Sequence, residues 1–371
     1  MRRGNIVAVI AAAAIGLAAM APPAVAQSKS KAWTDAVAGA ATEGSVVINI
    51  PAGNALHDFL AREWTKTFPQ IKLEINAIDE ATWIQRVRIE RDSGKYLWDA
   101  SMSGSVTAFA MKNSGFVVAI VPELILDDVK DPKLWGGWDR VFTDNEHRYV
   151  MATQNFLKMP FYNAKLLAPE KVKAEGTKVF LDPALKGKFV WNDPLLPTSG
   201  ETFALVMRKL LGDAGLKTFV TEQAVFLPNM MDMVDKMARG QYAVSLGPVM
   251  TAMLQRYKDA GLDLDVRPLG NTPAEGAYSN FGGSNLIMMK DPPHPNGGRV
   301  FVNWMLSKEV AAGLAKAQTQ DSNRVDLASI LPAALQPVAG VTYVEPQRES
   351  SVDELRAAHD LIKDIRGAMP H

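Results

Sequence analysis

The amino-acid sequence predicts an α/β protein made of two lobes. Short apolar runs, typical of buried strands, alternate along the chain with amphipathic segments of helical spacing. About 345 of the 371 residues follow a short N-terminal leader, which is more than one small core organises. No internal repeat, low-complexity tract or long linker interrupts the alternation. We therefore expect two lobes joined by strands that cross between them.

The first 26 residues predict a cleavable secretory signal peptide. Two arginines precede an apolar run over residues 6–20, and Ala-Val-Ala at 24–26 supplies the small residues of a cleavage site. A membrane anchor is the alternative, but a spanning helix needs about 20 apolar residues and this run is shorter. No cysteine follows the site, so we expect no lipid-anchored form. We expect a mature chain that begins at Gln27 and resides in the periplasm.

The composition excludes several kinds of site and partner. The chain has no cysteine, so disulfides and thiolate metal sites are not available. It has 40 acidic and 40 basic residues, and Arg2 and Arg3 belong to the leader, which leaves the mature chain with 38 basic residues and a net charge of about −2. Because a nucleic-acid-binding surface needs clustered basic charge, we expect no nucleic-acid partner.

The mature chain opens with alternating strands and helices. Residues 46–50 are an apolar run typical of a buried strand, and residues 56–64 place Leu, Phe and Trp on one helical face before Pro69. Residues 71–75 alternate apolar and polar side chains as in a strand, and residues 82–92 have helical spacing. This order predicts parallel strand pairing through crossover helices.

A second set of elements begins near Phe161. Residues 188–191 indicate a strand, and after a turn-rich loop an apolar helical face follows, with Gly212 where a C-terminal cap belongs. Residues 229–239 predict a helix and residues 242–246 a strand.

The remaining chain returns with one strand and further helices. Residues 286–289 predict the strand, and residues 299–318 predict helices after a proline-rich turn. A final helix is expected over residues 352–365, where Ser351 and Glu354 match a capping box.

The sequence lacks the motifs of the common enzyme classes. It contains no G-x-S-x-G elbow, no phosphate loop and no G-x-G-x-x-G fingerprint. The histidines lack H-E-x-x-H spacing, so each is interpreted as a surface or turn residue rather than a metal ligand. They are His57, His147, His294, His359 and His371. We therefore expect a binding protein rather than an enzyme, with no cofactor and no metal site.

Three small polar loops are candidates for ligand binding. In open parallel sheets, ligands bind beyond the carboxyl ends of the strands, where helix N termini offer free N–H groups. Loops of this kind lie at residues 51–54, 101–105 and 197–200. The candidate contacts in them are Asn54, Ser103, Gly104, Ser105, Thr198, Ser199 and Gly200.

Each loop also has a purely structural interpretation. Thr198 and Glu201 match a capping box, which would stabilise only its own helix, and Glu201 would compete there with an anionic ligand. The loop at 101–105 is open to the same alternative. The methionines between 230 and 237 could line a pocket, but a core-facing helix is favoured because methionine fills irregular cores well.

Several short stretches have a specific order and spacing when taken together. They are 161–163 (FYN), 181–183 (LDP), 186–188 (KGK), 191–194 (WNDP), 198–200 (TSG), 233–242 (MVDKMARGQY), 294–296 (HPN) and 301–309 (FVNWMLSKE). In these stretches, and over nearly all of the mature chain, the sequence resembles the extracellular solute-binding proteins of ABC importers. The resemblance is to the branch with ferric-iron, phosphonate, polyamine and thiamine binders.

The resemblance implies a two-lobed periplasmic binding-protein fold. Each lobe would be a mostly parallel sheet flanked by helices, and two crossover segments would join the lobes. The first lobe would comprise residues 27–155 and 275–371, including the C-terminal helices, and the second lobe residues 156–274. The cleft between them would close on a small solute, and the protein, expected to be a monomer, would then dock on an inner-membrane ABC permease.

One departure from the family bears on the solute. Iron-binding members carry adjacent tyrosines just after the strand corresponding to 242–246, whereas residues 247–250 here read Gly-Pro-Val-Met. Ferric iron needs hard anionic oxygen ligands such as phenolates, so we expect a small organic solute. One alternative is a ferric-iron binder that uses Tyr162, Tyr242 and Tyr278, and another is a periplasmic enzyme on the same scaffold. Tyr278 is included among the candidate ligand contacts.

Overall fold

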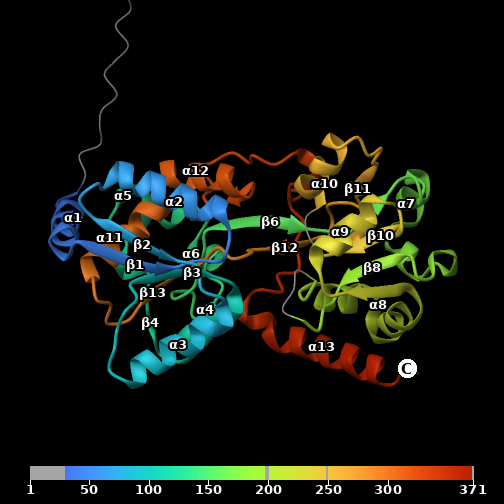
Figure 1. Cartoon of the computed structure of the whole chain (residues 1–371), viewed down its shortest axis with the longest axis horizontal. Coiled ribbons are helices and arrows are strands. Elements are labelled where there is room, and N and C mark those ends of the chain that lie inside the picture. The colour runs from blue at the N-terminus through green and yellow to red at the C-terminus, as the bar shows by residue number, and fades with distance from the viewer. Residues whose placement is uncertain (1–29, 197–199, 248–249, 370–371) are drawn as a thin grey trace, which may run out of the picture.

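Two lobes lie side by side in the computed structural model of the chain (Figure 1), each built on a sheet of its own. The structure describes residues 30–196, 200–247 and 250–369, so the expected signal peptide, Thr198 and Ser199 lie outside the described residues. None of the helices in this part of the chain has the length and apolar character of a membrane-spanning segment.

The first lobe is built on a mixed sheet. Its strands, in spatial order, are β2 (Lys72–Asn76), β1 (Ser45–Asn49), β3 (Ala100–Ser103), β13 (Asn285–Met289) and β4 (Val117–Val118), with β5 (Met151–Ala152) also paired to β13. β1 is parallel to β2 and β3, whereas β13 is antiparallel to β3, β4 and β5. The sheet is therefore parallel only in its first half, and not mostly parallel as expected, because the returning strand β13 runs in the opposite direction.

Helices cover both faces of this sheet (Figure 1). On one face Trp64 of α2 is buried and meets Trp304 of α11 edge-on, with ring centroids 5.1 Å apart. On the other face Trp83 of α3 is buried against Trp98, and Phe109 of α4 joins the same cluster. The helices are α1 (Lys31–Glu43), α2 (Asn54–Thr67), α3 (Glu80–Asp92), α4 (Ser105–Asn113), α5 (Asp127–Lys130), α6 (Trp138–Val141), α11 (Pro295–Leu306) and α12 (Lys308–Gln318).

The second lobe also has a mixed sheet. Its strands, in spatial order, are β11 (Val266–Pro268), β7 (Phe161–Asn163), β10 (Val244–Leu246), β8 (Phe189–Asn192) and β9 (Ala224–Leu227). β8 is parallel to β9 and β10, and β7 is antiparallel to β10 and β11. The helices are α7 (Pro169–Glu175), α8 (Phe203–Thr218), α9 (Met230–Ala238) and α10 (Met250–Asp259).

Two local features of the second lobe bear on the sequence analysis. Met233 and Met237 are fully buried in a core cluster with Val190, so these methionines belong to the core, as favoured. α8 is interrupted at Gly212, whose φ of 66° and ψ of 174° are not helical. Gly212 therefore ends a first helical segment, as predicted, and a second segment continues directly to Thr218.

A three-stranded antiparallel sheet joins the lobes at the centre of Figure 1. β6 (Gln154–Lys158) carries the chain into the second lobe, β12 (Tyr278–Asn280) brings it back, and β14 (Asp321–Ser322) pairs with β6. Tyr278 lies opposite Lys158 in the register, so both side chains project from the same face of the two-stranded ribbon. β6 and β12 are the two expected crossover segments, and together we call them the hinge ribbon.

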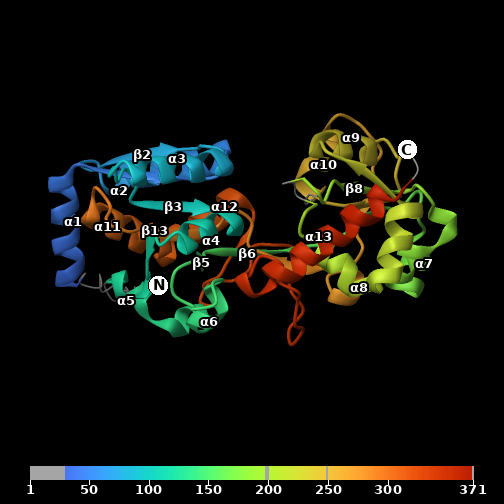
Figure 2. The same cartoon turned by 90° about the horizontal axis from the view of Figure 1, so that it is seen from below.

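The last helix packs on the second lobe rather than on the first. α13 (Val352–Gly367) extends from the hinge along α8 (Figure 2), and Ala358 and Ile362 are buried in the second lobe's core. The expected grouping of this helix with the first lobe is therefore incorrect. The expected capping box is also absent, because a 3₁₀ turn over Glu349–Ser351 gives Ser351 a helical backbone and its side chain caps nothing.

The segment before α13 is attached to the first lobe. Arg348 donates hydrogen bonds of 2.8 Å to the carbonyl oxygens of Phe142 and Arg140, and Glu349 accepts one of 2.5 Å from Lys112. The chain thus crosses between the lobes again after the hinge ribbon. The lobe boundaries after residues 155 and 274 remain our proposal, with α13 assigned to the second lobe.

Candidate functional site

The loop after β3 lies beside the hinge. Ser103 ends β3, and its carbonyl accepts a 3.3 Å hydrogen bond from the side-chain amide of Asn285. Ser284, the preceding residue, donates its hydroxyl to the carbonyl of Gln154 in the hinge ribbon at 3.2 Å. The candidate segment 103–105 is therefore positioned where the first lobe meets the crossover strands.

The loop after β1 lies at the same edge of the sheet. Asn49 of β1 pairs with Ser101 of β3, so the two strands end side by side. Asn54 is exposed and, with Gly283 and Gln318, lines a cavity of about 300 Å³. Among the described residues no hydrogen bond joins Asn54 to the segment 103–105.

Glu80, which the sequence analysis did not single out, occupies the N terminus of α4. Its carboxylate accepts hydrogen bonds from the backbone N–H of Gly104 at 2.7 Å and from the hydroxyl of Thr107 at 2.5 Å. A carboxylate is stabilised at a helix N terminus by the free N–H groups and the helix dipole. A Cβ on Gly104 would lie 2.9 Å from the carboxylate, so a side chain there would push Glu80 away. The N–H of Gly104, which was expected to bind a ligand, therefore already donates to Glu80.

The hydroxyl of Ser103 remains unused among the described residues. Ser103 is about 1% exposed, and its Oγ has no hydrogen-bond partner in that part of the chain. Burying a hydroxyl without a partner costs about 1–3 kcal/mol. An unsatisfied group beside the hinge fits a role in holding a polar ligand.

Gly200 packs tightly inside the second lobe. A Cβ on it would lie 1.6 Å from the carbonyl oxygen of Asn192, and its own carbonyl accepts a 3.1 Å hydrogen bond from the indole of Trp191. Glycine is therefore required at position 200 because the backbone of β8 lies so close to it, and not because a ligand needs space there. α8 begins only at Phe203, three residues later.

Tyr278 joins the hinge ribbon to the start of α8. It is fully buried, its hydroxyl lies 2.5 Å from the Oγ1 of Thr202, and its ring meets Phe203 edge-on with centroids 4.9 Å apart. Burial raises the pKa of the Tyr278 phenol. The residue therefore holds the second lobe to the hinge, and its environment disfavours a phenolate.

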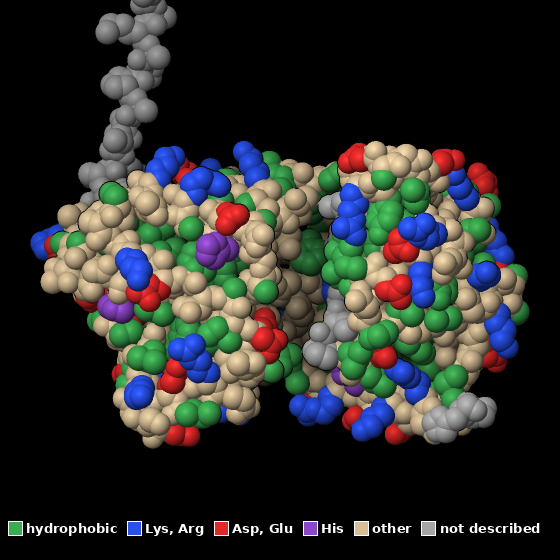
Figure 3. All heavy atoms as spheres, in the orientation of Figure 1, with side chains coloured by type: hydrophobic (Ala, Val, Ile, Leu, Met, Phe, Trp, Pro, Cys, Tyr) green, Lys and Arg blue, Asp and Glu red, His purple; other side chains and the backbone are tan. Residues whose placement is uncertain are grey.

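Four charged or titratable side chains interact around the hinge. Burial raises the pKa of the Glu201 carboxyl, the charges of His359 and Lys158 lower it, and Glu80 raises it further. Burial also lowers the pKa of the Lys158 ammonium to about 8, and Glu201 opposes that shift. Glu80 of the first lobe and Glu201 of the second are thus near enough to repel one another. Figure 3 shows a groove between the lobes, with acidic side chains at the rim of the first lobe.

Buried amides lie on the same face of the hinge ribbon as Lys158 and Tyr278. Gln154 lies four residues from Lys158 along β6, and Asn280 lies two residues from Tyr278 along β12. Because successive side chains in a strand point to opposite faces, all four side chains lie on one face. Neither amide atom of Gln154 has a partner among the described residues, and neither does Nδ2 of Asn280. This face therefore offers donors and an acceptor that the described residues do not satisfy.

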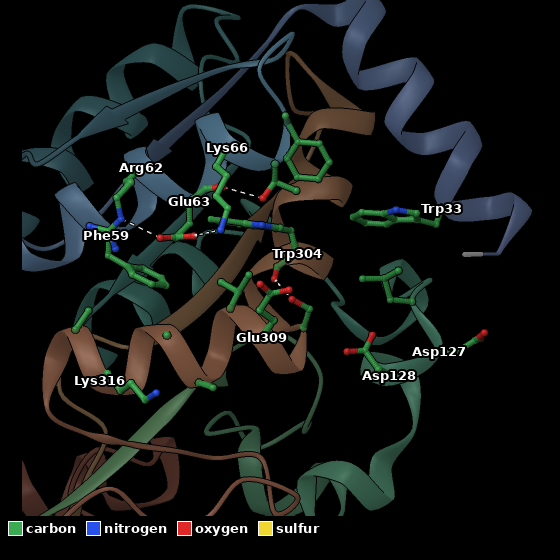
Figure 4. Close-up of a pocket in the computed structure, with 18 of the residues that line it drawn as sticks. Trp33, Phe59, Arg62, Glu63, Lys66, Asp127, Asp128, Trp304, Glu309 and Lys316 are labelled. Carbon is green, nitrogen blue, oxygen red and sulfur yellow. Dashed lines mark hydrogen bonds and ion pairs between the residues drawn. The ribbon is translucent and has the colours of Figure 1, made fainter. Parts of the chain in front are cut away.

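A larger cavity lies within the first lobe, away from the groove. Its volume is about 920 Å³. Figure 4 shows it between α1, α2 and α12, with aromatic walls that include Trp33 and Trp304. Glu63 at its rim pairs with Arg62 at 2.9 Å and with Lys66 at 3.8 Å. Because only one lobe lines this cavity, a movement of the lobes toward each other would not cover a ligand in it.

The candidate residues fall into two groups around the hinge. Ser103, Gly104 and Ser105 lie at the first lobe's edge, and Gly200 and Tyr278 lie on the second lobe's side. Among the described residues no three His, Asp or Glu side chains are placed to hold a metal ion. The sequence analysis missed Glu80, Gln154 and Lys158. Each is positioned beside the hinge by residues that are distant in the sequence.

Comparison with known proteins identifies both a sequence family and a fold. The sequence profile of bacterial extracellular solute-binding proteins matches residues 48–312. No curated protein sequence matches the chain.

Solved structures similar to this fold include three bacterial binding proteins. Iron-bound HitA from Pseudomonas aeruginosa has a TM-score of 0.64 and 17% identity, covering 86% of this chain and 99% of that one. An iron- and citrate-bound protein from Trichodesmium (IdiA, FutA) has a TM-score of 0.65 and 14% identity, covering 87% and 99%. AfuA from Actinobacillus pleuropneumoniae, with fructose-6-phosphate bound, has a TM-score of 0.57 and 17% identity, covering 88% and 99%. At these identities the likeness concerns the two-lobed fold.

Proposed function

Because this chain belongs to the bacterial extracellular solute-binding proteins, we propose that it captures a small organic solute between its lobes. It would deliver that solute to an inner-membrane ABC permease. The observation that supports this most is the grouping of unsatisfied polar groups and charged side chains around one hinge. Ser103 contributes from the first lobe, Glu201 from the second, and Gln154 and Lys158 from the ribbon between them.

The hinge ribbon suits a protein that closes on its ligand. Hinge closure concentrates rotation in a few residues at the ends of elements while each lobe stays rigid. Here the two main connections are the short strands β6 and β12, and each lobe has its own core. Closure would remove water from the groove and strengthen polar contacts to the solute.

We propose the following residues as solute contacts. Ser103 and Ser105 would act from the first lobe, beside Glu80, and Asn54 at the outer edge of the same lobe. Thr198 and Ser199 would act from the second lobe, Gly200 would hold their loop against β8, and Tyr278 would position the start of α8. We further propose secretion to the periplasm with cleavage before Gln27, and a monomeric state.

Ferric iron is a weaker proposal for this chain, although two of the similar structures are described as holding it. Iron binding through Tyr162, Tyr242 and Tyr278 would require phenolates. Burial raises the pKa of Tyr278, and its hydroxyl is engaged by Thr202. A phenolate-to-iron absorption band on addition of ferric salt would favour iron instead.

Native mass spectrometry of protein purified from the periplasm of its host tests the proposed function. We expect one small organic molecule per chain, released on denaturation, with a lower melting temperature after its removal. Re-addition of the released solute should restore the melting temperature. A protein that retains no molecule, and that no fraction of host periplasmic extract stabilises, would contradict the proposal. Steady turnover of the solute would indicate the enzyme alternative.

A further inference from the structure

The N terminus of α4 is already neutralised by the protein itself. Both oxygens of the Glu80 carboxylate are engaged there, one by the N–H of Gly104 at 2.7 Å and one by the hydroxyl of Thr107 at 2.5 Å. An anionic solute at this helix would have to displace a tethered carboxylate and would meet its charge. The feature that commonly attracts oxyanions in such a groove is therefore closed to them.

The second lobe has another carboxylate near the hinge. Glu201 stands in the turn before α8, next to Thr202, and its carboxylate accepts no hydrogen bond from any described residue. It is close enough to Glu80 for the two negative charges to raise its pKa, although burial is the larger cause. Bringing the lobes together without a cation between these groups would increase this repulsion.

Lys158 balances only one of the two carboxylates. With Glu80 and Glu201 ionised and Lys158 protonated, the three groups carry one net negative charge. The fourth group, His359 of α13, donates a ring N–H to the backbone carbonyl oxygen of Glu201 at 3.2 Å. One positive charge on the solute would complete the balance.

An independent observation places a ligand at this point. Gln154 and Ser103 are each about 1% exposed, yet neither amide atom of Gln154 nor the Oγ of Ser103 has a partner among the described residues. Gln154 projects from the ribbon face that carries Lys158, and Ser103 adjoins Gly104 beneath Glu80. Buried groups of this kind ordinarily have partners, and both lie at the first-lobe end of the hinge, where the neighbouring residues Ser284 and Asn285 contact the backbones of Gln154 and Ser103.

We propose that the solute carries a positively charged nitrogen, as an ammonium or guanidinium group, which binds between Glu80 and Glu201. Its uncharged polar part would contact Ser103 and Gln154. This inference rests on the proposed function and specifies its substrate class. A guanidinium or ammonium group has only hydrogen-bond donors. It can therefore donate to both carboxylates when closure brings the two lobes together.

Matched small molecules test this charge assignment. The probes are putrescine, agmatine and arginine as cations or zwitterions, succinate as the dicarboxylate of matched length, and butane-1,4-diol as the uncharged diol. We expect thermal stabilisation of ligand-stripped protein only by molecules with a charged nitrogen, and calorimetry then gives the affinity of the best of them. Glu201→Gln should weaken that affinity about tenfold or more, the effect of losing a charged hydrogen-bond partner.

Glu222→Gln is the matched control. Glu222 is an exposed glutamate on the same lobe, so this variant changes the net charge equally but should leave the affinity unchanged. A retained solute that is anionic or uncharged, bound equally by parent and Glu201→Gln, would refute the charge assignment while the proposed transport function stands. Failure to bind any molecule, native or added, would instead refute the proposed function.

Discussion

The cap that Glu80 forms on α4 predicts a measurable loss of stability when it is removed. Glu80→Ala deletes the acceptor of two hydrogen bonds, those from Gly104 and Thr107. Hydrogen bonds to a charged group contribute about 1.5–3 kcal/mol when well buried, and a carboxylate at a helix N terminus adds about 0.3–1 kcal/mol. Glu80 is half-buried and water can replace part of this. We therefore expect Glu80→Ala to lower the free energy of unfolding by about 2 kcal/mol, the upper end for a lost N-cap.

Two further variants separate the charge from the hydrogen bonds. Glu80→Gln keeps an oxygen for the N–H of Gly104 but loses the charge, so we expect a smaller loss of about 0.5–1 kcal/mol. Glu74→Ala removes a carboxylate whose partner among the described residues is the exposed Lys72 at 2.9 Å, and should cost less than about 0.5 kcal/mol.

Urea unfolding followed by tryptophan fluorescence measures all three variants against the parent, with the melting temperature as a second reading. The prediction requires the order Glu80→Ala, Glu80→Gln, Glu74→Ala from most to least destabilised. Equal stability of Glu80→Ala and the parent would show that the carboxylate does not cap α4. The helix N terminus would then be open to an anion, and the preference for a cationic solute would lose its first support.

Three other perturbations have defined outcomes. Gly200→Ala places a Cβ 1.6 Å from the carbonyl of Asn192 and should cost about 3 kcal/mol or more in urea unfolding; an unchanged midpoint would refute the tight packing. Tyr278→Phe loses the hydroxyl bonded to Thr202 and should cost about 1 kcal/mol, with a double variant that also carries Thr202→Val showing coupling between the two changes. Because the pKa of Lys158 is lowered to about 8 in the folded state, the unfolded chain binds more protons between pH 8 and 10.5, so stability from this group rises with pH there. Lys158→Met should remove that rise in the free energy of unfolding, which is at most about 3 kcal/mol. If the difference in free energy of unfolding between the variant and the parent stays constant from pH 8 to 10.5, the lowered pKa of Lys158 is contradicted.

The order of elements was predictable because apolar periodicity is local. The apolar run at 46–50 corresponds to β1 (Ser45–Asn49), and the periodic segment 82–92 to α3 (Glu80–Asp92). The direction of β13 was not predictable from such patterns, since a fully buried strand has the same apolar run whether its neighbours are parallel or antiparallel. Its pairing with β3 and β4 is decided by contacts about 170–190 residues apart.

The sequence predicted which loops lie beside the hinge but not the side chains that occupy them. The rule that ligands bind beyond strand ends selected the loop at 101–105, and the structure places this loop beside the hinge. It could not reveal that Glu80, 24 residues earlier in the chain, fills the helix N terminus in that loop. The position of Glu201 beside the start of α8 suggested from the sequence that it would compete with an anionic ligand. In the structure Glu80 of the first lobe adds a second negative charge that acts on Glu201.

The C-terminal segment limits how the lobes can move. Glu349 is attached to the first lobe by Lys112 and by a 2.9 Å hydrogen bond from the backbone N–H of Asn145, whereas α13 begins at Val352 and packs on the second lobe. Val352 still packs against the first lobe's cluster around Trp83, and the first residues of α13 to contact the second lobe are Glu354 and Leu355. The short segment around Asp353 must therefore absorb the rotation that β6 and β12 allow, or one attachment must open. The ion pair between Lys112 and Glu349 has both side chains largely buried, which makes its opening costly. The closure that we propose would therefore be a small rotation about the hinge, and a small rotation suits a solute held between Glu80 and Glu201.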